Sequence, residues 1–280
     1  MLQILDRLMT TSASLAYVAG PALEDAVAAC RRFADEGLSS TVGYWDSGEG
    51  ADPREVADAY LRALSAVQAE GLDAYLSIKA PPLQMSSAWV EKVVGCAREH
   101  DLGVHFDSLF PQAADRTLEL VGESLRLHAR VGCTVAGRWR RGPADALRAA
   151  ALGVMRVRVV KGQWEDPGDP RRDLRAGFLD AIDALAGQPV RVAVATHDPP
   201  LARQALQRLR DAGTPCELEL LYGLPVNAAR AVARELDVPV RMYVPYGKAY
   251  MPYALSQLRR NPKVVWWYLR DTLAGGRRAA

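Results

Sequence analysis

The sequence predicts a single (β/α)8 barrel, and three observations support that prediction. Eight short runs rich in β-branched residues alternate with longer amphipathic segments, which is the pattern of parallel βα units. No low-complexity linker divides the chain, and its 280 residues suit one large α/β domain. Eight successive units favour closure into a barrel, while an open doubly wound sheet is the alternative.

The eight expected strands are short and apolar, and most of them end in a polar or glycine residue. They are Thr41–Trp45, Ala74–Ala80, Gly103–Ser108, Cys133–Trp139, Met155–Gly162, Val190–His197, Cys216–Gly223 and Val240–Gly247. Because parallel strands share one direction, their carboxyl ends should meet at one rim of the barrel.

A helix-like segment follows each expected strand. The segments are Pro53–Glu70, Ser87–His100, Ala113–Ala129, Ala144–Leu152, Asp173–Leu185, Pro200–Asp211, Asn227–Leu236 and a last one from about Lys248 onward. An extra helix, Pro21–Glu36, precedes the first strand, where we expect it to plug the bottom of the barrel. The expected organisation is one domain, 1–280, with an N-terminal helical extension over 1–38.

Capping residues mark several of these helix boundaries. Asp52-Pro53 and Asp198-Pro199 each place an acceptor side chain before a first-turn proline, which favours a helix start. Gly71, Gly187 and Gly213 follow helix-like segments, where glycine adopts the left-handed conformation that ends a helix.

Composition and charge exclude several classes of protein. Lys+Arg number 35 against 33 for Asp+Glu, and this balance argues against nucleic acid as the main ligand. The four cysteines lack CxxC spacing, so we expect reduced thiols rather than a zinc site or redox dithiol. No apolar run approaches the ~20 residues of a membrane span, and we expect a cytoplasmic protein.

Polar residues gather at the expected strand ends, where barrel ligands bind. A charge inside a barrel costs desolvation energy unless it is paired. Lys79 and Asp107 lie on neighbouring strands, so we expect them to pair with each other. Lys161-Gly162 and the helix start at Asp198 offer a positive charge and backbone N–H groups to a phosphate.

The order of these residues resembles the proline dehydrogenase family of flavoenzymes. The most specific segments are RVVKGQW at 158–164, ATHDP at 195–199, ELELLYG at 217–223 and VRMYVPYGKAYMPY at 240–253. The resemblance runs from about the first strand to the end of the chain, and it implies a distorted (β/α)8 barrel that binds FAD at the strand carboxyl ends. It implies no metal.

The resemblance assigns a role to each matching residue. Arg158, Lys161 and Gly162 would hold the flavin side and its phosphates, with Thr196 and His197 serving the nucleotide. Trp164 stands where the family usually has a tyrosine, and Glu219 and Ala136 replace two flavin-contacting glutamines. The implied cofactor site is therefore Arg158, Lys161, Gly162, Trp164, Thr196, His197 and Glu219.

The implied substrate site departs from the family in one place. Asp107 would orient Tyr243, and Tyr253 of the final helix would pack over the substrate ring. The family carries two arginines after that tyrosine that bind the substrate carboxylate, and this chain has Ser256 and Gln257 there. The implied substrate site is Lys79, Asp107, Tyr243, Tyr253, Ser256 and Gln257.

Losing two arginine contacts should weaken carboxylate binding by ~3–6 kcal/mol, so free proline is expected to be a poor substrate. We expect an FAD-dependent oxidoreductase that takes hydride from a carbon beside the nitrogen of a proline-like or modified cyclic or secondary amine. The electron acceptor, whether quinone, oxygen or another compound, is left open. Two other functions remain open: a non-catalytic barrel that serves as a binding or partner subunit, and a flavin-free barrel enzyme that uses Lys79 for Schiff-base or proton-transfer chemistry.

Overall fold

The computed structural model describes residues 18–46 and 50–247. Within this part of the chain, eight parallel strands close into a barrel in sequence order, and the last strand pairs with the first. The strands are β1 (Ser39–Trp45), β2 (Ala74–Ile78), β3 (Val104–Phe106), β4 (Val131–Ala136), β5 (Arg156–Val160), β6 (Arg191–Ala195), β7 (Cys216–Leu221) and β8 (Val240–Gly247). The prediction of a (β/α)8 barrel is confirmed, and the open-sheet alternative is wrong.

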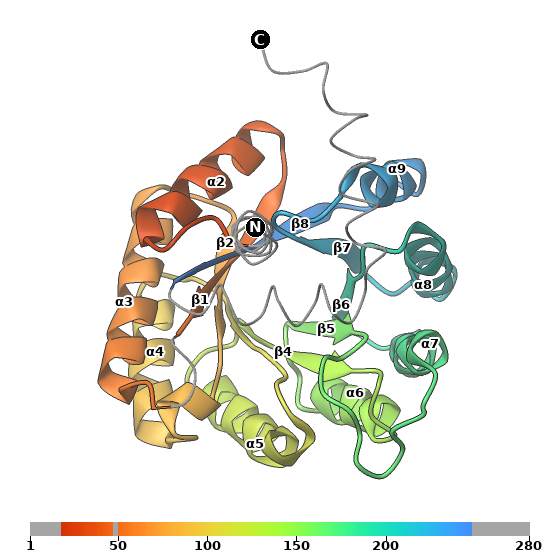
Figure 1. Ribbon diagram of the computed structural model, residues 1–280, viewed down its shortest axis with the longest axis horizontal. Coiled ribbons are helices and arrows are strands. Elements are labelled where there is room, and N and C mark those ends of the chain that lie inside the picture. The colour runs from red at the N-terminus through yellow and green to blue at the C-terminus, as the bar shows by residue number, and fades with distance from the viewer. Residues whose placement is uncertain (1–17, 47–49, 248–280) are drawn as a thin grey trace, which may run out of the picture.

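Helices form an outer ring around the strands (Figure 1). They are α2 (Leu23–Asp35), α3 (Pro53–Ala69), α4 (Ser87–Glu99), α5 (Ala114–Leu125), α6 (Gly142–Ala151), α7 (Leu174–Leu185), α8 (Pro199–Asp211) and α9 (Asn227–Glu235). Short 3-10 turns, Pro81–Leu83 and Pro111–Ala113, precede α4 and α5. The expected helix from about Lys248 onward lies outside the described residues.

The predicted capping residues are confirmed. The Asp52 carboxylate accepts a hydrogen bond from the Arg54 N–H at the start of α3, and Asp198 accepts one from Leu201 in α8. Gly71, Gly187 and Gly213 follow α3, α7 and α8 with positive φ angles of 61°, 81° and 68°. These local signals fix the helix lengths, and so the positions at which the strands restart.

Several element boundaries differ from the sequence-based expectation by a few residues, most clearly around β3 and β4. The predicted helix 113–129 ends at Leu125, because the chain turns there and β4 begins at Val131, two residues earlier than expected. Strand β3 is only three residues long, although the Asp107 N–H still donates to the Ile78 carbonyl oxygen at 2.8 Å. Asp107 is therefore held by the sheet even though it follows the strand.

Helix α2 does not plug the barrel, so that part of the prediction is wrong. It packs on the outer side of β1 and β8, burying a stripe of small residues that includes Ala26, Ala29 and Cys30. The Glu36 carboxylate at its end pairs with Arg230 of α9 at 2.9 Å. An apolar helix face suits this outer side, because the barrel interior is lined by charged side chains, as described below.

The carboxyl end of β4 meets the start of α7 through two glycines. A Cβ atom at Gly177 would overlap the carbonyl oxygen of Gly137, and one at Gly137 would overlap the backbone of Phe178. This close approach brings α7 onto the barrel beside the segment that follows β5. Only residues without a side chain permit it.

We expect Gly177→Ala to lower the free energy of unfolding by about 1–3 kcal/mol, because backbone atoms cannot yield to the added methyl group. Gly95→Ala in α4 is the matched control, since a Cβ there would meet no atom within 4 Å. That control should be stabilising by about 0.5–1 kcal/mol. Urea unfolding of both variants measures the difference, and equal stabilities would contradict the close approach.

Candidate active site

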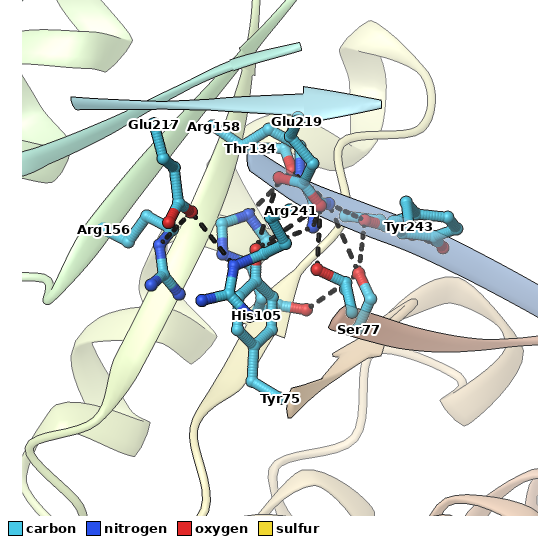
Figure 2. Close-up of polar contacts among 12 residues, drawn as sticks. Tyr75, Ser77, His105, Thr134, Arg156, Arg158, Glu217, Glu219, Arg241 and Tyr243 are labelled. Carbon is cyan, nitrogen blue, oxygen red and sulfur yellow. Dashed lines mark hydrogen bonds and ion pairs between the residues drawn. The ribbon is translucent and has the colours of Figure 1, made fainter. Parts of the chain in front are cut away.

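The barrel interior is charged along its whole length. Alternate residues of each strand point inward, and at these positions β5 carries Arg156 and Arg158 while β7 carries Glu217 and Glu219. Figure 2 shows these side chains converging with those of β2, β3, β4 and β8. Valine and leucine, which normally fill a barrel, occupy the outward positions of β5 and β7 under the helices.

Asp107 lies where this network reaches the carboxyl ends of the strands, and four side chains contact it. Its Oδ1 accepts hydrogen bonds from the Ser77 hydroxyl at 2.6 Å and from Arg158 Nη1 at 2.7 Å. Its Oδ2 accepts one from the Tyr243 hydroxyl at 3.0 Å and lies 3.5 Å from Lys79 Nζ. Burial alone would raise the pKa of the Asp107 carboxyl, but Lys79 and Arg158 together with these hydrogen bonds lower it below its ordinary value.

The structure brings Lys79 and Asp107 together, as the sequence predicted. The Lys79 ammonium also donates to the Tyr44 carbonyl oxygen at 3.2 Å and lies 5.8 Å from the centre of the Trp45 ring. The Lys79 N–H donates to the Tyr60 hydroxyl at 3.0 Å. Lys79 is thus fixed at both ends, with its ammonium group directed across the end of the barrel.

Tyr243 reaches Asp107 because β1 provides space for its ring. A Cβ at Gly43 would overlap the Tyr243 hydroxyl, so a larger residue at position 43 would displace that group. Burial, and next the neighbouring Asp107 carboxylate, raise the pKa of Tyr243 well above its ordinary value. Tyr243 therefore stays protonated and donates its hydrogen bond to Asp107.

Arg158 and Glu219 form a bidentate ion pair on the side of Asp107 that faces the barrel interior. Arg158 Nε and Nη2 each lie 2.7 Å from a Glu219 carboxylate oxygen. Nη2 also donates to the Tyr75 hydroxyl at 3.2 Å, and Nη1 donates to Asp107 and to the Thr134 hydroxyl. Each of the five N–H groups of the guanidinium thus has a protein acceptor. This gives Arg158 an interior position rather than the exposed one that a phosphate contact needs.

A second charged cluster lies beneath this pair, and sequence reasoning missed it. Arg156 Nε and Arg241 Nε lie 2.8 Å and 3.2 Å from the same Glu217 carboxylate oxygen, and both guanidiniums lie against the Tyr75 ring (Figure 2). The missed signal is the alternation itself. RVRVV and ELELL place charges at every second position of otherwise apolar strands, which predicts one charged face.

Other predicted residues lie at the same carboxyl rim of the barrel, after β5 and β6. Lys161 Nζ lies 3.9 Å from Asp198, which also pairs with Arg175. Gly162 has a φ of +97°, and a Cβ there would press against the Cβ atoms of Arg138 and Ala136. Burial lowers the pKa of Lys161, although its side chain is still 37% exposed. This rim therefore combines accessible positive charge with a close approach of the Gly162 backbone to Ala136 and Arg138.

Thr196 and Trp164 complete the described part of the predicted cofactor site. The Thr196 hydroxyl is buried and accepts a hydrogen bond from the Asp198 N–H at 3.2 Å. Trp164 is 46% exposed, packs edge-on against Phe110, and its carbonyl oxygen accepts a hydrogen bond from the Trp139 indole at 3.0 Å. Tyr253, Ser256 and Gln257 lie outside the described residues.

His197 links two strand ends through both of its ring nitrogens. Nε2 accepts a hydrogen bond from the Leu221 N–H at 2.8 Å, and Nδ1 lies 2.9 Å from the Pro225 carbonyl oxygen. Burial lowers its pKa to about 4. Its ring nitrogens are therefore committed to the β7–α9 connection, and only the ring face remains for a nucleotide.

The neutral His197 should make stability dependent on pH. The unfolded chain binds a proton near pH 6.5 and the folded chain near pH 4, so stability falls as pH drops through this window. The loss should reach about 3 kcal/mol at pH 4, and His197→Gln should lack this component. Urea unfolding between pH 7 and 4 measures it. An identical pH dependence in both proteins would contradict the assignment.

Fold and site together define a (β/α)8 barrel with a buried polar cluster at the carboxyl ends of its strands. No family model matches the sequence. Proline dehydrogenase 1 of Bacillus subtilis subsp. natto is 24% identical over 276 residues, covering 92% of this chain and 89% of that protein. Proline dehydrogenase of Deinococcus radiodurans is 24% identical over 285 residues with the same coverage. The chain is therefore similar to bacterial proline dehydrogenases over nearly its whole length.

Solved structures show the same fold. Proline utilization A from Bdellovibrio bacteriovorus superposes with a TM-score of 0.76 at 16% identity over 90% of this chain. Proline utilization A from Bradyrhizobium japonicum gives 0.64 at 18% identity over 84%. The chain covers 33% and 30% of those two longer proteins.

Among the described residues, no helix has the length and apolar character needed to cross a membrane.

Proposed function

We propose that this protein is an FAD-dependent oxidoreductase of the proline dehydrogenase type. Its substrate is a proline-like or modified cyclic or secondary amine, oxidised at a carbon beside the nitrogen. One observation carries the proposal: Lys79, Asp107 and Tyr243 form one partly buried cluster, joined by an ion pair and a hydrogen bond, at the carboxyl ends of the strands. The similarity to bacterial proline dehydrogenases supports the reaction class. The proposal treats 1–280 as one barrel domain with a helical extension over 1–38.

The residues at the rim fit an FAD cofactor. Lys161 is a partly exposed cation and Arg138 packs beside Gly162, so this rim offers positive charge to a phosphate group. Lys161, Gly162 and Thr196 would hold the diphosphate side, while the faces of His197 and Trp164 would meet the nucleotide. When bound, FAD supplies the two-electron acceptor for the amine, and the protein supplies position and polarity.

The chain's own residues orient the substrate rather than take up its proton. Asp107 already accepts from Ser77, Arg158 and Tyr243 and pairs with Lys79, and these contacts keep it ionised. An ionised carboxylate with a lowered pKa is a poor proton acceptor at neutral pH. Its role in the proposal is to hold Lys79 and Tyr243 in place, so that these two side chains bound the substrate.

A flavin-free reaction that uses Lys79 as a nucleophile finds less support in the contacts. A Schiff base needs the Lys79 nitrogen free to attack a carbonyl carbon, whereas that nitrogen contacts the Tyr44 carbonyl oxygen and the Asp107 carboxylate. Borohydride trapping of a carbonyl compound on Lys79 would support that reaction. A non-catalytic barrel would instead show no flavin reduction with any amine.

Titration of the protein with FAD tests the proposal. Lys161→Ala should weaken FAD binding by ~1.5–3 kcal/mol, because it removes one charge-assisted contact with a phosphate. Lys92→Ala is the matched control, since Lys92 is an exposed lysine on α4 paired with Asp58. Flavin absorbance and thermal stabilisation report binding. Absence of both signals in the unmodified protein would refute the proposed function.

A further inference from the structure

We propose that Glu219 is a specificity-determining residue that makes the active site electrically neutral, so that the site favours amines without a free carboxylate group. This inference rests on the proposed function and deepens it by naming the substrate class. The resemblance to proline dehydrogenases implies a neutral glutamine at this position, so the charge of Glu219 is a property of this chain.

The contacts of Glu219 show that its carboxylate is fully engaged. Each oxygen accepts a hydrogen bond from the Arg158 guanidinium at 2.7 Å, and Oε1 also accepts one from the Thr41 hydroxyl at 2.8 Å. The Tyr75 hydroxyl lies 3.3 Å and 3.4 Å from the two oxygens. The Arg158 and Glu219 side chains are 5% and 2% exposed. Every close neighbour of the carboxylate is a donor, which is the environment of an ionised group.

Small residues on β6 allow this pair to form. Arg158 of β5 is in register with Ala193, and Glu219 of β7 is in register with Ala195. Because the two alanines have short side chains on the same face, Arg158 and Glu219 meet across the strand that separates them. The pairing is therefore built into three consecutive strands.

A charge count explains the effect on the active site. Lys79, Asp107, Arg158 and Glu219 are joined by ion pairs, and their two positive and two negative charges cancel. Arg156, Arg241 and Glu217 beneath them add one net positive charge, and the buried Asp46 that follows β1 adds one negative charge, so four positive and four negative charges still cancel. With a neutral residue at position 219, the four-residue cluster would carry one net positive charge directly beneath Asp107.

That positive charge is what an anionic substrate group would need. Arg158 Nη1 contacts Asp107, and Asp107 contacts Lys79 and Tyr243, so a change in charge at Arg158 acts on the side chains that bound the substrate. In a low-dielectric interior, one unit charge changes the binding of an opposite charge by about tenfold or more. The pair with Glu219 removes this attraction for carboxylates.

L-proline and L-prolinamide form a matched pair of probes, because they share the ring and amine and differ in one negative charge. Binding of each probe to FAD-supplemented protein is measured by thermal stabilisation and by perturbation of the flavin spectrum. We expect the unmodified protein to bind L-prolinamide more tightly than L-proline. Glu219→Gln should shift the ratio of the two dissociation constants by about tenfold toward L-proline.

The double variant Arg158→Gln/Glu219→Gln separates charge from structure. It removes both members of the pair and restores neutrality, so the ratio should return to that of the unmodified protein. An unmodified protein that prefers L-proline would overturn the inference, as would a ratio that moves less than twofold in Glu219→Gln or fails to return in the double variant. Failure to bind FAD would instead refute the proposed function, and the probe ratio from thermal stabilisation would still decide the inference.

Discussion

Arg158→Met should lower the free energy of unfolding by about 3–5 kcal/mol. The substitution leaves the Glu219 carboxylate, 2% exposed, without its cation and removes one of the two cations that contact Asp107. Removing one member of a buried ion pair costs far more than removing both, because the remaining charge is desolvated and uncompensated.

The double variant Arg158→Met/Glu219→Leu is the control for this result. It should be more stable than Arg158→Met alone, because no unpaired carboxylate remains at position 219. Urea unfolding of the two variants and the unmodified protein completes the comparison. If Arg158→Met alone costs less than about 1 kcal/mol, the interior ion pair is not the strong interaction that its geometry indicates.

The second large effect concerns Lys79 and Asp107. Asp107→Leu should cost about 3–5 kcal/mol, since it removes the carboxylate that Lys79, Arg158 and Tyr243 share. In a double-mutant cycle with Lys79→Met, the coupling energy should be about 1–3 kcal/mol, because the two side chains are only 14% and 13% exposed.

An exposed pair of the same residue types offers the matched control. Lys92 and Asp58 approach to 3.4 Å, close to the 3.5 Å of the buried pair, but their side chains are 48% and 43% exposed. Their coupling should be below about 1 kcal/mol, because water screens them. Equal coupling in the two cycles would show that burial does not strengthen the Lys79–Asp107 interaction.

The sequence predicted the barrel because its signals are local. β-branched runs, first-turn prolines and terminal glycines specify strands and helix ends without reference to the rest of the chain. The position of α2 was not predictable in the same way. Its apolar stripe requires an apolar partner but does not say which one, and the alternating charges of RVRVV and ELELL do not by themselves say that their face is the barrel interior.

Sequence order predicted the contacts between residues on neighbouring strands of the candidate site but not those between more distant strands. Lys79 and Asp107 follow neighbouring strands, so their approach could be inferred from order alone, and the shared position of Tyr243 at a strand end added the third member. Arg158 and Glu219 belong to strands separated by β6. Their contact depends on Ala193 and Ala195 leaving space between them, which strand order does not reveal.

The ion pair between Arg158 and Glu219 bears on the cofactor role predicted for Arg158. The resemblance placed Arg158 among the cofactor contacts, whereas its guanidinium donates to Glu219, Asp107, Tyr75 and Thr134. In the proposed site, Arg158 would therefore act on a ligand through Asp107 and the charge of the network. Lys161 and Gly162, at the accessible rim, are the better candidates for direct contact with a cofactor.

Anaerobic reduction of bound flavin tests the proposed function most directly. Protein supplemented with FAD and freed of unbound cofactor should retain a flavin spectrum, and excess cyclic secondary amine should bleach it without oxygen or another electron acceptor. L-prolinamide should bleach it faster than L-proline. A protein that retains no flavin, or whose flavin stays oxidised with every cyclic and secondary amine in the series, would contradict an amine-oxidising flavoenzyme.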